Sequence, residues 1–289
     1  MCGAMAEAAV HGLDGIALAD VQRRAFAVLC ALADFCDEHE IRYYLVGGTL
    51  LGAVRHSGFI PWDDDIDIAV PRTDYERLLS LLALLPPALK ASHPRIDPRT
   101  PYPFLVVSDA QSSLVIDYVR PYDRGVGVDV FPLDTAPQTG WRQAVLWKGI
   151  ALLRAMTMNK QGGYYRRPAA WGQRLRFVLL SLLNTMFPRR FLYAVYDTWV
   201  SKGGGLAGLT GNLFGLYGRR ELVPSHVLGA ASRIQFMSHW FSAPAKPEEY
   251  LRAVYGDFMR MPPEKDRHSG HRIRSVSFEP ASTAGNFPA

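Results

Sequence analysis

The feature that most constrains this chain is a dense acidic run, WDDDIDIAV, at residues 62–70. Four carboxylates in five positions repel one another, whereas the apolar residues on either side favour burial. The alternation in Ile66–Val70 predicts a β-strand, in which side chains two positions apart point to the same face. We therefore expect three of the carboxylates to converge: Asp63, Asp65 and Asp67.

Three interpretations of the acidic run are open. A solvated turn is the common role for a run of like charges. A calcium-binding loop would have Asp63, Asp65, Asp67 and Asp74 at its first, third, fifth and twelfth positions. At its sixth position, however, such a loop requires glycine, and this chain has Ile68. A divalent cation, Mg²⁺ or Mn²⁺, would offset the repulsion and prefers oxygen ligands. The spacing favours the cation site over the solvated turn.

Two further segments fit a site for a metal ion and a phosphate. Asp129 lies between two valines in a third alternating stretch, so a later strand can add a fourth carboxylate. Upstream, Gly47, Gly48 and Thr49 follow an apolar segment at the start of a short predicted helix. Glycine lets backbone amides approach a phosphate closely, and a helix N-terminus favours negative charge.

The periodicity predicts an α/β (α+β) fold with helices and strands around one mixed sheet. Helices are expected at residues 18–40 and 49–54, and from Asp74 to the pair Pro86–Pro87. Strands are expected at residues 41–46, 66–70, 104–109, 113–120 and 128–130. The segments FLVVSD (104–109) and SLVIDYVR (113–120) are expected to pair with each other.

A change in character near residue 140 predicts two regions. Residues 17–140 are expected to form the catalytic core, and residues 141–272 a helical region that completes the site. Residues 273–289, which are rich in serine, alanine and proline, are expected to be disordered.

The cysteines and the N-terminal sequence indicate the cellular compartment. The three cysteines have neither the even count of a disulfide framework nor the spacing of a zinc site, which favours a reducing compartment. The N-terminus lacks the basic and apolar regions of a signal peptide. A cytoplasmic protein is the expectation.

The charge is unevenly distributed. Between Arg154 and Arg220 there are eleven Lys or Arg residues and one acid, Asp197. The apolar run RLRFVLLSLLNTMF in this stretch is too short to span a bilayer, which needs about 20 residues. Its leucines fit core helices. The arginines that flank it also suit peripheral contact with the inner face of a membrane: Arg174, Arg176, Arg189 and Arg190. Both interpretations stay open. Nucleic-acid binding is not expected.

The stretch VGGTLLGAVRHSGFIPWDDDIDIAVPRTDYERLL resembles the signature of the LicD family, and its DxD with a later carboxylate resembles the nucleotidyltransferase fold of DNA polymerase beta. The resemblance extends to GVGVDVFPLD and to PAKPEEYLRAVYGDFMRMPPEKDRH, so it covers most of residues 17–270, with little at 140–235. It implies a polymerase-beta-like core with a helical C-terminal region.

The resemblance also implies an activity. Family members move phosphocholine or a polyol phosphate from a CDP-linked donor, such as CDP-choline or a CDP-polyol, to a hydroxyl of a glycan or glycolipid, as in lipopolysaccharide or teichoic acid biosynthesis. Two alternatives are a nucleotidyltransferase that attaches NMP to a small acceptor and a non-catalytic glycan-binding module. The metal expected for the transferase is Mg²⁺ or Mn²⁺.

The resemblance to the LicD family also implies roles for individual residues. Asp65 and Asp67 would be the principal metal ligands, Asp63 an additional one, and Asp129 would complete the metal site or accept the proton of the attacking hydroxyl. Substrate contacts are expected from the glycine turn (Gly47, Gly48, Thr49) and from three basic residues: Arg55, His56 and Lys246.

For each basic residue an ordinary role stays open. Arg55 fits a phosphate clamp or a surface ion pair, His56 a loop hydrogen bond or catalysis, and Lys246 a phosphate contact or a surface position. Asp64 is expected to be a hydrogen-bond acceptor and not a ligand. His268 and His271 make only a weak zinc pair.

Overall fold

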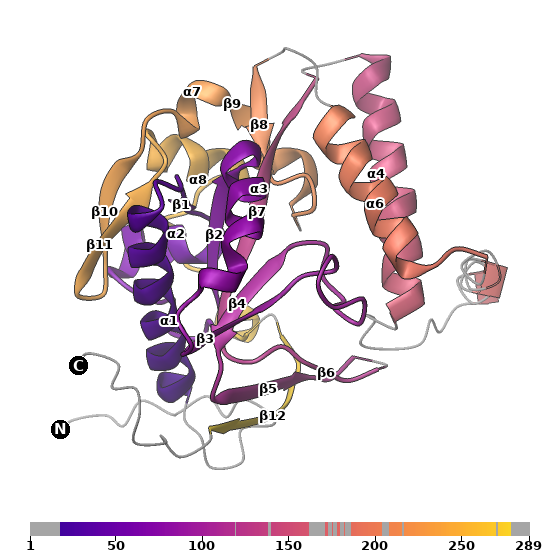
Figure 1. Ribbon diagram of the computed structural model, residues 1–289. Helices are drawn as coiled ribbons and strands as arrows, with labels where there is room; N and C mark the ends of the chain where they lie inside the picture. Colours follow the sequence, from indigo (N-terminus) through magenta and orange to yellow (C-terminus); the bar gives the residue numbers. More distant parts are fainter. Residues whose placement is uncertain are drawn as a thin grey trace.

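The computed structural model describes residues 18–278 except 119, 138–139, 162–170, 173–174, 176–177, 180–181, 183–185, 204–207, 216 and 270. Within these residues, helices pack on a central sheet and smaller sheets lie beside it (Figure 1). The predicted mixed α/β class is confirmed.

The central sheet is mixed. Its strand order is β1 (Tyr44–Leu45), β2 (Ile66–Pro71), β7 (Gly127–Ala136), β4 (Leu105–Asp109) and β3 (Leu89–Ser92). β2 and β7 are parallel, and the other neighbours are antiparallel. At its far end β7 also pairs with β8 (Leu209–Gly211), which pairs with β9 (Val223–Pro224). The strands predicted around residues 66–70 and 128–130 are therefore adjacent at the centre of the sheet.

Helices cover this sheet. α1 (Leu18–Glu38) buries an apolar face against β7 and β4, as its periodicity predicts, and the chain then turns through Glu40 with φ 53°. α2 (Gly47–His56) and α3 (Arg72–Leu81) contact β2, and a 3₁₀ turn, η1 (Leu82–Leu84), follows α3 before the proline pair. All three predicted helices are confirmed, with α2 longer than expected.

A separate three-stranded sheet corrects one prediction. β5 (Ser112–Ile116) pairs with β6 (Tyr122–Asp123) and with β12 (Ile273–Phe278), not with β4. The expected pairing of FLVVSD with SLVIDYVR is wrong because β4 already uses both edges, bonding to β3 and β7. The disorder expected from residue 273 is also wrong for residues 273–278, since β5 offers β12 an edge; residues 279–289 lie outside the described part of the chain.

The region after residue 140 is not only helical, which corrects a third expectation. α4 (Trp141–Gln161) and α6 (Arg189–Gly203) pack on each other at one edge of the molecule (Figure 1). The chain then adds β8, β9 and a hairpin of β10 (Ser232–Phe236) and β11 (His239–Ala243). The remaining short elements are η2 (Gly218–Glu221), α7 (Ser225–Leu228), α8 (Pro247–Tyr255) and η3 (Glu264–Asp266).

Two of the three apolar clusters among the described residues explain this arrangement. The main core joins α1 and the central sheet to α7, α8 and β11, so segments from both sides of residue 140 share one interior. A smaller core lies between α4 and α6 and includes Ile150 and Tyr196. The predicted boundary near residue 140 coincides with the start of α4, and the division into a catalytic core and a region that completes its site stays a prediction. Among the described residues, no helix combines the length and apolarity that crossing a membrane requires.

Candidate active site

The predicted carboxylates meet at the start of the parallel strand pair. Asp67 on β2 stands directly opposite Asp129 on β7, and Asp65 precedes β2. One carboxylate oxygen from each of these three residues lies within 4.8 Å of the other two. The structure therefore brings together three of the four expected metal ligands, from segments that are far apart in the sequence.

Asp63 lies beside this group rather than in it. Its side chain hydrogen-bonds to Asp65, and its Oδ2 is 2.6 Å from the place where a Cβ on Gly48 would stand. It does not belong to the set of three oxygens that share one centre. Its role as an additional ligand stays a prediction.

The glycine turn is packed against the carboxylates. Gly47 has φ +57°, and a Cβ there would collide with the Asp67 carboxylate, so the backbone approaches the acidic cluster closely only because the side chain is absent. Val46, which precedes α2, supplies no side-chain cap to the helix N-terminus, and this end of a helix favours an anion.

Thr49 has a positioning role. Its Oγ1 accepts a hydrogen bond from the Asp67 amide at 2.8 Å, and the residue is only 3% exposed. The Val46 amide donates to the Asp67 carbonyl at 3.1 Å. Together these bonds fix β2 against the start of α2. A direct contact between Thr49 and substrate stays a prediction.

The electrostatics of the cluster suit a cation. Burial, followed by the charges of Asp65 and its neighbours, raises the pKa of Asp63 and of Asp67 well above the ordinary value. Burial also raises the pKa of Asp129 to about 6, although Arg124 opposes the shift. The carboxylates are thus crowded and under-compensated, and a hard divalent ion would relieve this condition. The donor set fits Mg²⁺ or Mn²⁺.

Arg124 is a neighbour that the sequence pattern did not indicate. Its guanidinium is 3% exposed and donates to the Asp129 carboxylate. It also lies 5.5 Å from the centre of the Tyr102 ring. A lone arginine between β6 and β7 carries no periodic signal, and only the tertiary fold places it behind Asp129.

Two residues near the C-terminus, Ser269 and His271, contact the acidic run. Ser269 donates to Asp64 Oδ1 at 2.6 Å, and His271 Nδ1 lies 3.3 Å from the same oxygen and 3.6 Å from Asp65. The prediction that Asp64 is a hydrogen-bond acceptor is confirmed. Burial lowers the pKa of His271, but Asp65 and Asp64 outweigh it and raise the pKa to about 9. One ligand atom from each of Asp64, Asp65 and His271 also lies within 4.8 Å of the other two, so these three residues form a second group that could hold a metal ion. Among the described residues, His268 belongs neither to this group nor to that of Asp65, Asp67 and Asp129.

Arg55 and His56 lie at the end of α2. Arg55 Nη1 donates to the Phe258 carbonyl at 3.0 Å, and its Nε lies 3.5 Å from His56 Nδ1. Arg55 therefore ties α2 to the segment that follows α8. Burial, with the charge of Arg55 next, lowers the pKa of His56 below its ordinary value. Phosphate contacts for both residues stay predictions.

Lys246 precedes α8, and its Nζ lies 3.2 Å from Glu249 on an exposed face. This geometry is that of a surface ion pair, which was the alternative for this residue. Its phosphate contact stays a prediction.

Glu221 is a second residue near the cluster that the sequence pattern did not indicate. It is 7% exposed and accepts a hydrogen bond from the Tyr217 amide at 3.0 Å. Burial raises its pKa to about 7, and its charge adds to the forces that raise the pKa of Asp67. η2 therefore brings a further carboxyl group toward the cluster from the second half of the chain.

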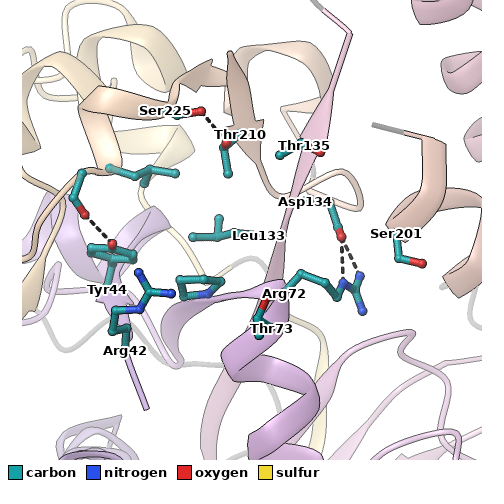
Figure 2. A pocket seen from close by; sticks show the side chains of 13 residues that line it. Arg42, Tyr44, Arg72, Thr73, Leu133, Asp134, Thr135, Ser201, Thr210 and Ser225 are labelled. Carbon is teal, nitrogen blue, oxygen red and sulfur yellow. Dashed lines mark hydrogen bonds and ion pairs between the residues drawn. The ribbon is translucent and has the colours of Figure 1, made fainter. Parts of the chain in front are cut away.

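A pocket of about 470 Å³ lies elsewhere, at the opposite ends of β2 and β7 (Figure 2). Its charged side chains are already paired within the protein. Arg72 donates to Asp134 at 2.6 and 2.7 Å and to Asp197 at 2.9 Å, while Arg42 donates to Asp74 at 2.7 Å. The pocket contains none of the carboxylates of the predicted metal site.

Comparison with known proteins agrees with this geometry. Residues 40–150 match the family described as LicD/FKTN/FKRP, nucleotidyltransferase domain. The chain carries a LicD family domain. The resemblance inferred from the sequence is thereby confirmed, and the LicD domain contains the glycine turn, the acidic run and β7 with Asp129.

Similarity to one relative extends beyond the LicD domain. The lipopolysaccharide cholinephosphotransferase LicD of Haemophilus influenzae is 25% identical over 244 residues, which cover 82% of this chain and 89% of the relative. The human ribitol 5-phosphate transferase FKRP is 57% identical over 30 residues, which cover 10% of this chain and 6% of the relative. An uncharacterised protein of Rickettsia prowazekii, RP689, is 49% identical over 45 residues, or 16% of this chain and 17% of the relative.

Proposed function

We propose that this protein is a LicD-type phosphotransferase that moves a phosphorylated small alcohol, phosphocholine or a polyol phosphate, from a CDP-linked donor to a glycan hydroxyl. The observation that carries the proposal is the convergence of Asp65, Asp67 and Asp129 beside an uncapped helix N-terminus inside a LicD domain. Two relatives whose names specify cholinephosphate and ribitol phosphate transfer support the substrate class.

The proposal gives a role to each part of the site. Asp65, Asp67 and Asp129 would hold Mg²⁺ or Mn²⁺, which supplies charge neutralisation to a diphosphate when bound. Gly47 and Gly48 would allow the α2 amides to approach the donor phosphates. Asp129, with its pKa near 6, is also suited to accept the proton of the attacking hydroxyl. Arg124 would hold Asp129 in place.

The proposed fold is a nucleotidyltransferase core like that of DNA polymerase beta. A glycine turn opening α2, a DxD entering β2 and a third carboxylate on the adjacent β7 support this assignment. The proposed location is the cytoplasm, because Cys30 and Cys36 are free thiols.

The decisive experiment labels the donor at two positions. Purified protein is incubated with Mg²⁺, a glycolipid acceptor, and CDP-choline, CDP-ribitol or CDP-glycerol carrying label in the alcohol or in the cytidine. We expect label from the alcohol to enter the acceptor and label from the cytidine to leave as CMP. Transfer of the cytidine label would instead support a nucleotidyltransferase, and no transfer from any donor would support a non-catalytic glycan-binding module. Asp65→Asn should abolish transfer, whereas Asp34→Asn, an exposed position on α1, should not.

A further inference from the structure

The pocket shown in Figure 2 is separate from the acidic site. Its volume of about 470 Å³ falls in the range of sites for small molecules. It lies at the carboxyl ends of β2 and β7, which are parallel. This is the end of parallel strands at which α/β sheets commonly bind ligands. The size and the position of the pocket are therefore those of a ligand site.

The charges around the pocket balance. Arg42 and Arg72 line it, and each is paired with a carboxylate: Arg42 Nε lies 2.7 Å from Asp74, and Arg72 Nη2 lies 2.6 Å from Asp134. The ion pairs in and around the lining join four arginines to four carboxylates: Arg42, Arg72, Arg77 and Arg95 with Asp74, Glu76, Asp134 and Asp197. This lining therefore has no excess charge that would select an ionic ligand.

Hydroxyl groups line the pocket from α3, β7 and β8. Thr73 on α3 and Thr135 on β7 are exposed, and their hydroxyls make no hydrogen bond to another residue that the structure describes. On β8 the hydroxyl of Thr210 is bonded to that of Ser225 at 2.8 Å, which leaves it capacity for a further bond. Because a hydroxyl both donates and accepts, this lining suits a ligand that is itself rich in hydroxyl groups.

The rest of the lining adds donors and an apolar surface. Arg42 uses Nε for Asp74, and its Nη1 and Nη2 have no hydrogen-bond partner within the described part of the chain. Apolar surface comes from Pro71, Leu133 and Leu228, and Figure 2 shows Leu133 among the polar side chains. A sugar ring has a rim of hydroxyls and an apolar C–H face, so it matches both parts of this lining.

We propose that this pocket binds a neutral sugar, at a site distinct from the acidic centre. The pocket residues Pro71 and Leu133 pair across β2 and β7. The carboxylate pair, Asp67 and Asp129, stands four positions earlier on the same strands, or about 13 Å away. A sugar in the pocket is therefore not the one whose hydroxyl would meet the carboxylates. The inference depends on the pocket alone and is independent of the proposed transferase activity.

The test is a saturation-transfer NMR titration of the purified protein with glucose, galactose and N-acetylglucosamine. At least one of these sugars should bind with a millimolar dissociation constant, and inorganic phosphate should not displace it. Thr135→Val, which keeps the shape of the side chain, should weaken that binding about two- to tenfold, because one hydrogen bond to the sugar is lost. Thr198→Val is the control and should bind like wild type, since Thr198 is exposed on α6 and does not line the pocket.

A second variant fills the pocket instead of removing a hydrogen bond. Thr73→Trp should abolish sugar binding, whereas Ser80→Trp, at an exposed position on α3 outside the lining, should not. Circular dichroism melting checks that both variants are folded, and Thr135→Val tests the site even if Thr73→Trp unfolds the protein.

A third variant separates this proposal from the transferase. Asp67→Asn, which should be inactive, should bind the sugar like wild type, so failure of the transferase proposal would not affect this one. The proposal would be overturned if none of the three sugars bound, or if phosphate displaced the bound sugar. Undiminished binding by Thr135→Val, or by a folded Thr73→Trp, would also overturn it.

Discussion

Asp67 and Asp129 face each other across two parallel strands, in register, with Asp65 at the entrance. Neither of these two carboxylates can ionise without affecting the other, so Asp67 and Asp129 titrate as a coupled pair. The fold holds these charges together by hydrogen bonds to the backbone of β2 and by Arg124 behind β7. Their mutual repulsion is stored in the folded state and has measurable consequences.

The first prediction concerns removal of one charge. Asp67→Asn should lower transferase turnover by roughly a thousandfold or more, since a principal metal ligand is lost. The same change should leave the thermal midpoint in EDTA unchanged or raised, because repulsion from Asp65 and Asp129 falls. Initial rates and melting curves check both effects. A variant that kept wild-type turnover would exclude Asp67 as a metal ligand. Asp34→Asn on α1 is the control, because it removes a carboxylate outside the acidic site.

The second prediction concerns the metal. Mg²⁺ or Mn²⁺ should raise the free energy of unfolding of the wild type by about 2.7 kcal/mol at a hundred times its dissociation constant. EDTA should reverse the effect, and Asp65→Asn should remove it. Urea denaturation with and without the ion measures the difference. If Asp65→Asn responded to the metal as wild type does, the ion would bind elsewhere.

The third prediction concerns Arg124. Because it is a buried charge paired with buried Asp129, Arg124→Met should lower the free energy of unfolding by about 3–5 kcal/mol. Arg124→Met combined with Asp129→Asn should recover part of that loss, since no unpaired charge remains. A double-mutant cycle in urea measures the coupling. Additive losses in the two single variants would show that the pair does not act together.

The fourth prediction concerns His93, which lies outside the acidic site. It is 6% exposed, and burial, with Arg95 next, lowers its pKa to about 4. A histidine with a depressed pKa contributes stability above its unfolded pKa of about 6.5 and loses it as pH falls to about 4. His93→Gln should therefore reduce the acid sensitivity of unfolding between pH 6.5 and 4, by up to about 3 kcal/mol. His226→Gln, at an exposed position, should leave the profile unchanged.

The acidic strand could be predicted because the pattern that specifies it lies within a few neighbouring residues. A period of two from Asp65 to Asp67 indicates that these side chains share a face, and the glycine pair marks the turn that packs against them. Asp63, which lies further before β2, is beside this face and not on it. The position of Asp129 follows from the same alternation. Parallel pairing of the two strands then places Asp67 and Asp129 in one centre.

Other parts of the site depend on contacts between distant segments. His271 meets Asp64 across 207 positions, and no spacing rule links them. The pairing of β5 with β12 and not with β4 likewise depends on β3 and β7, which occupy both edges of β4. Glu221 and Arg124 are isolated charges in the sequence, and burial beside the cluster gives them their significance.

The position of Ser269 and His271 also bears on synthesis of the chain. The acidic loop at Asp64 and Asp65 leaves the ribosome some two hundred residues before the imidazole that neutralises it, as the separation of the pair shows. Until then the loop remains an exposed anionic patch on a nascent chain whose β5 edge is also open. A premature stop before residue 269 would therefore yield a product that keeps most of its apolar core. Its acidic loop would lack Ser269 and His271, and one edge of β5 would be unpaired. We expect such a product to be degraded or to aggregate, and not to persist as a less active enzyme.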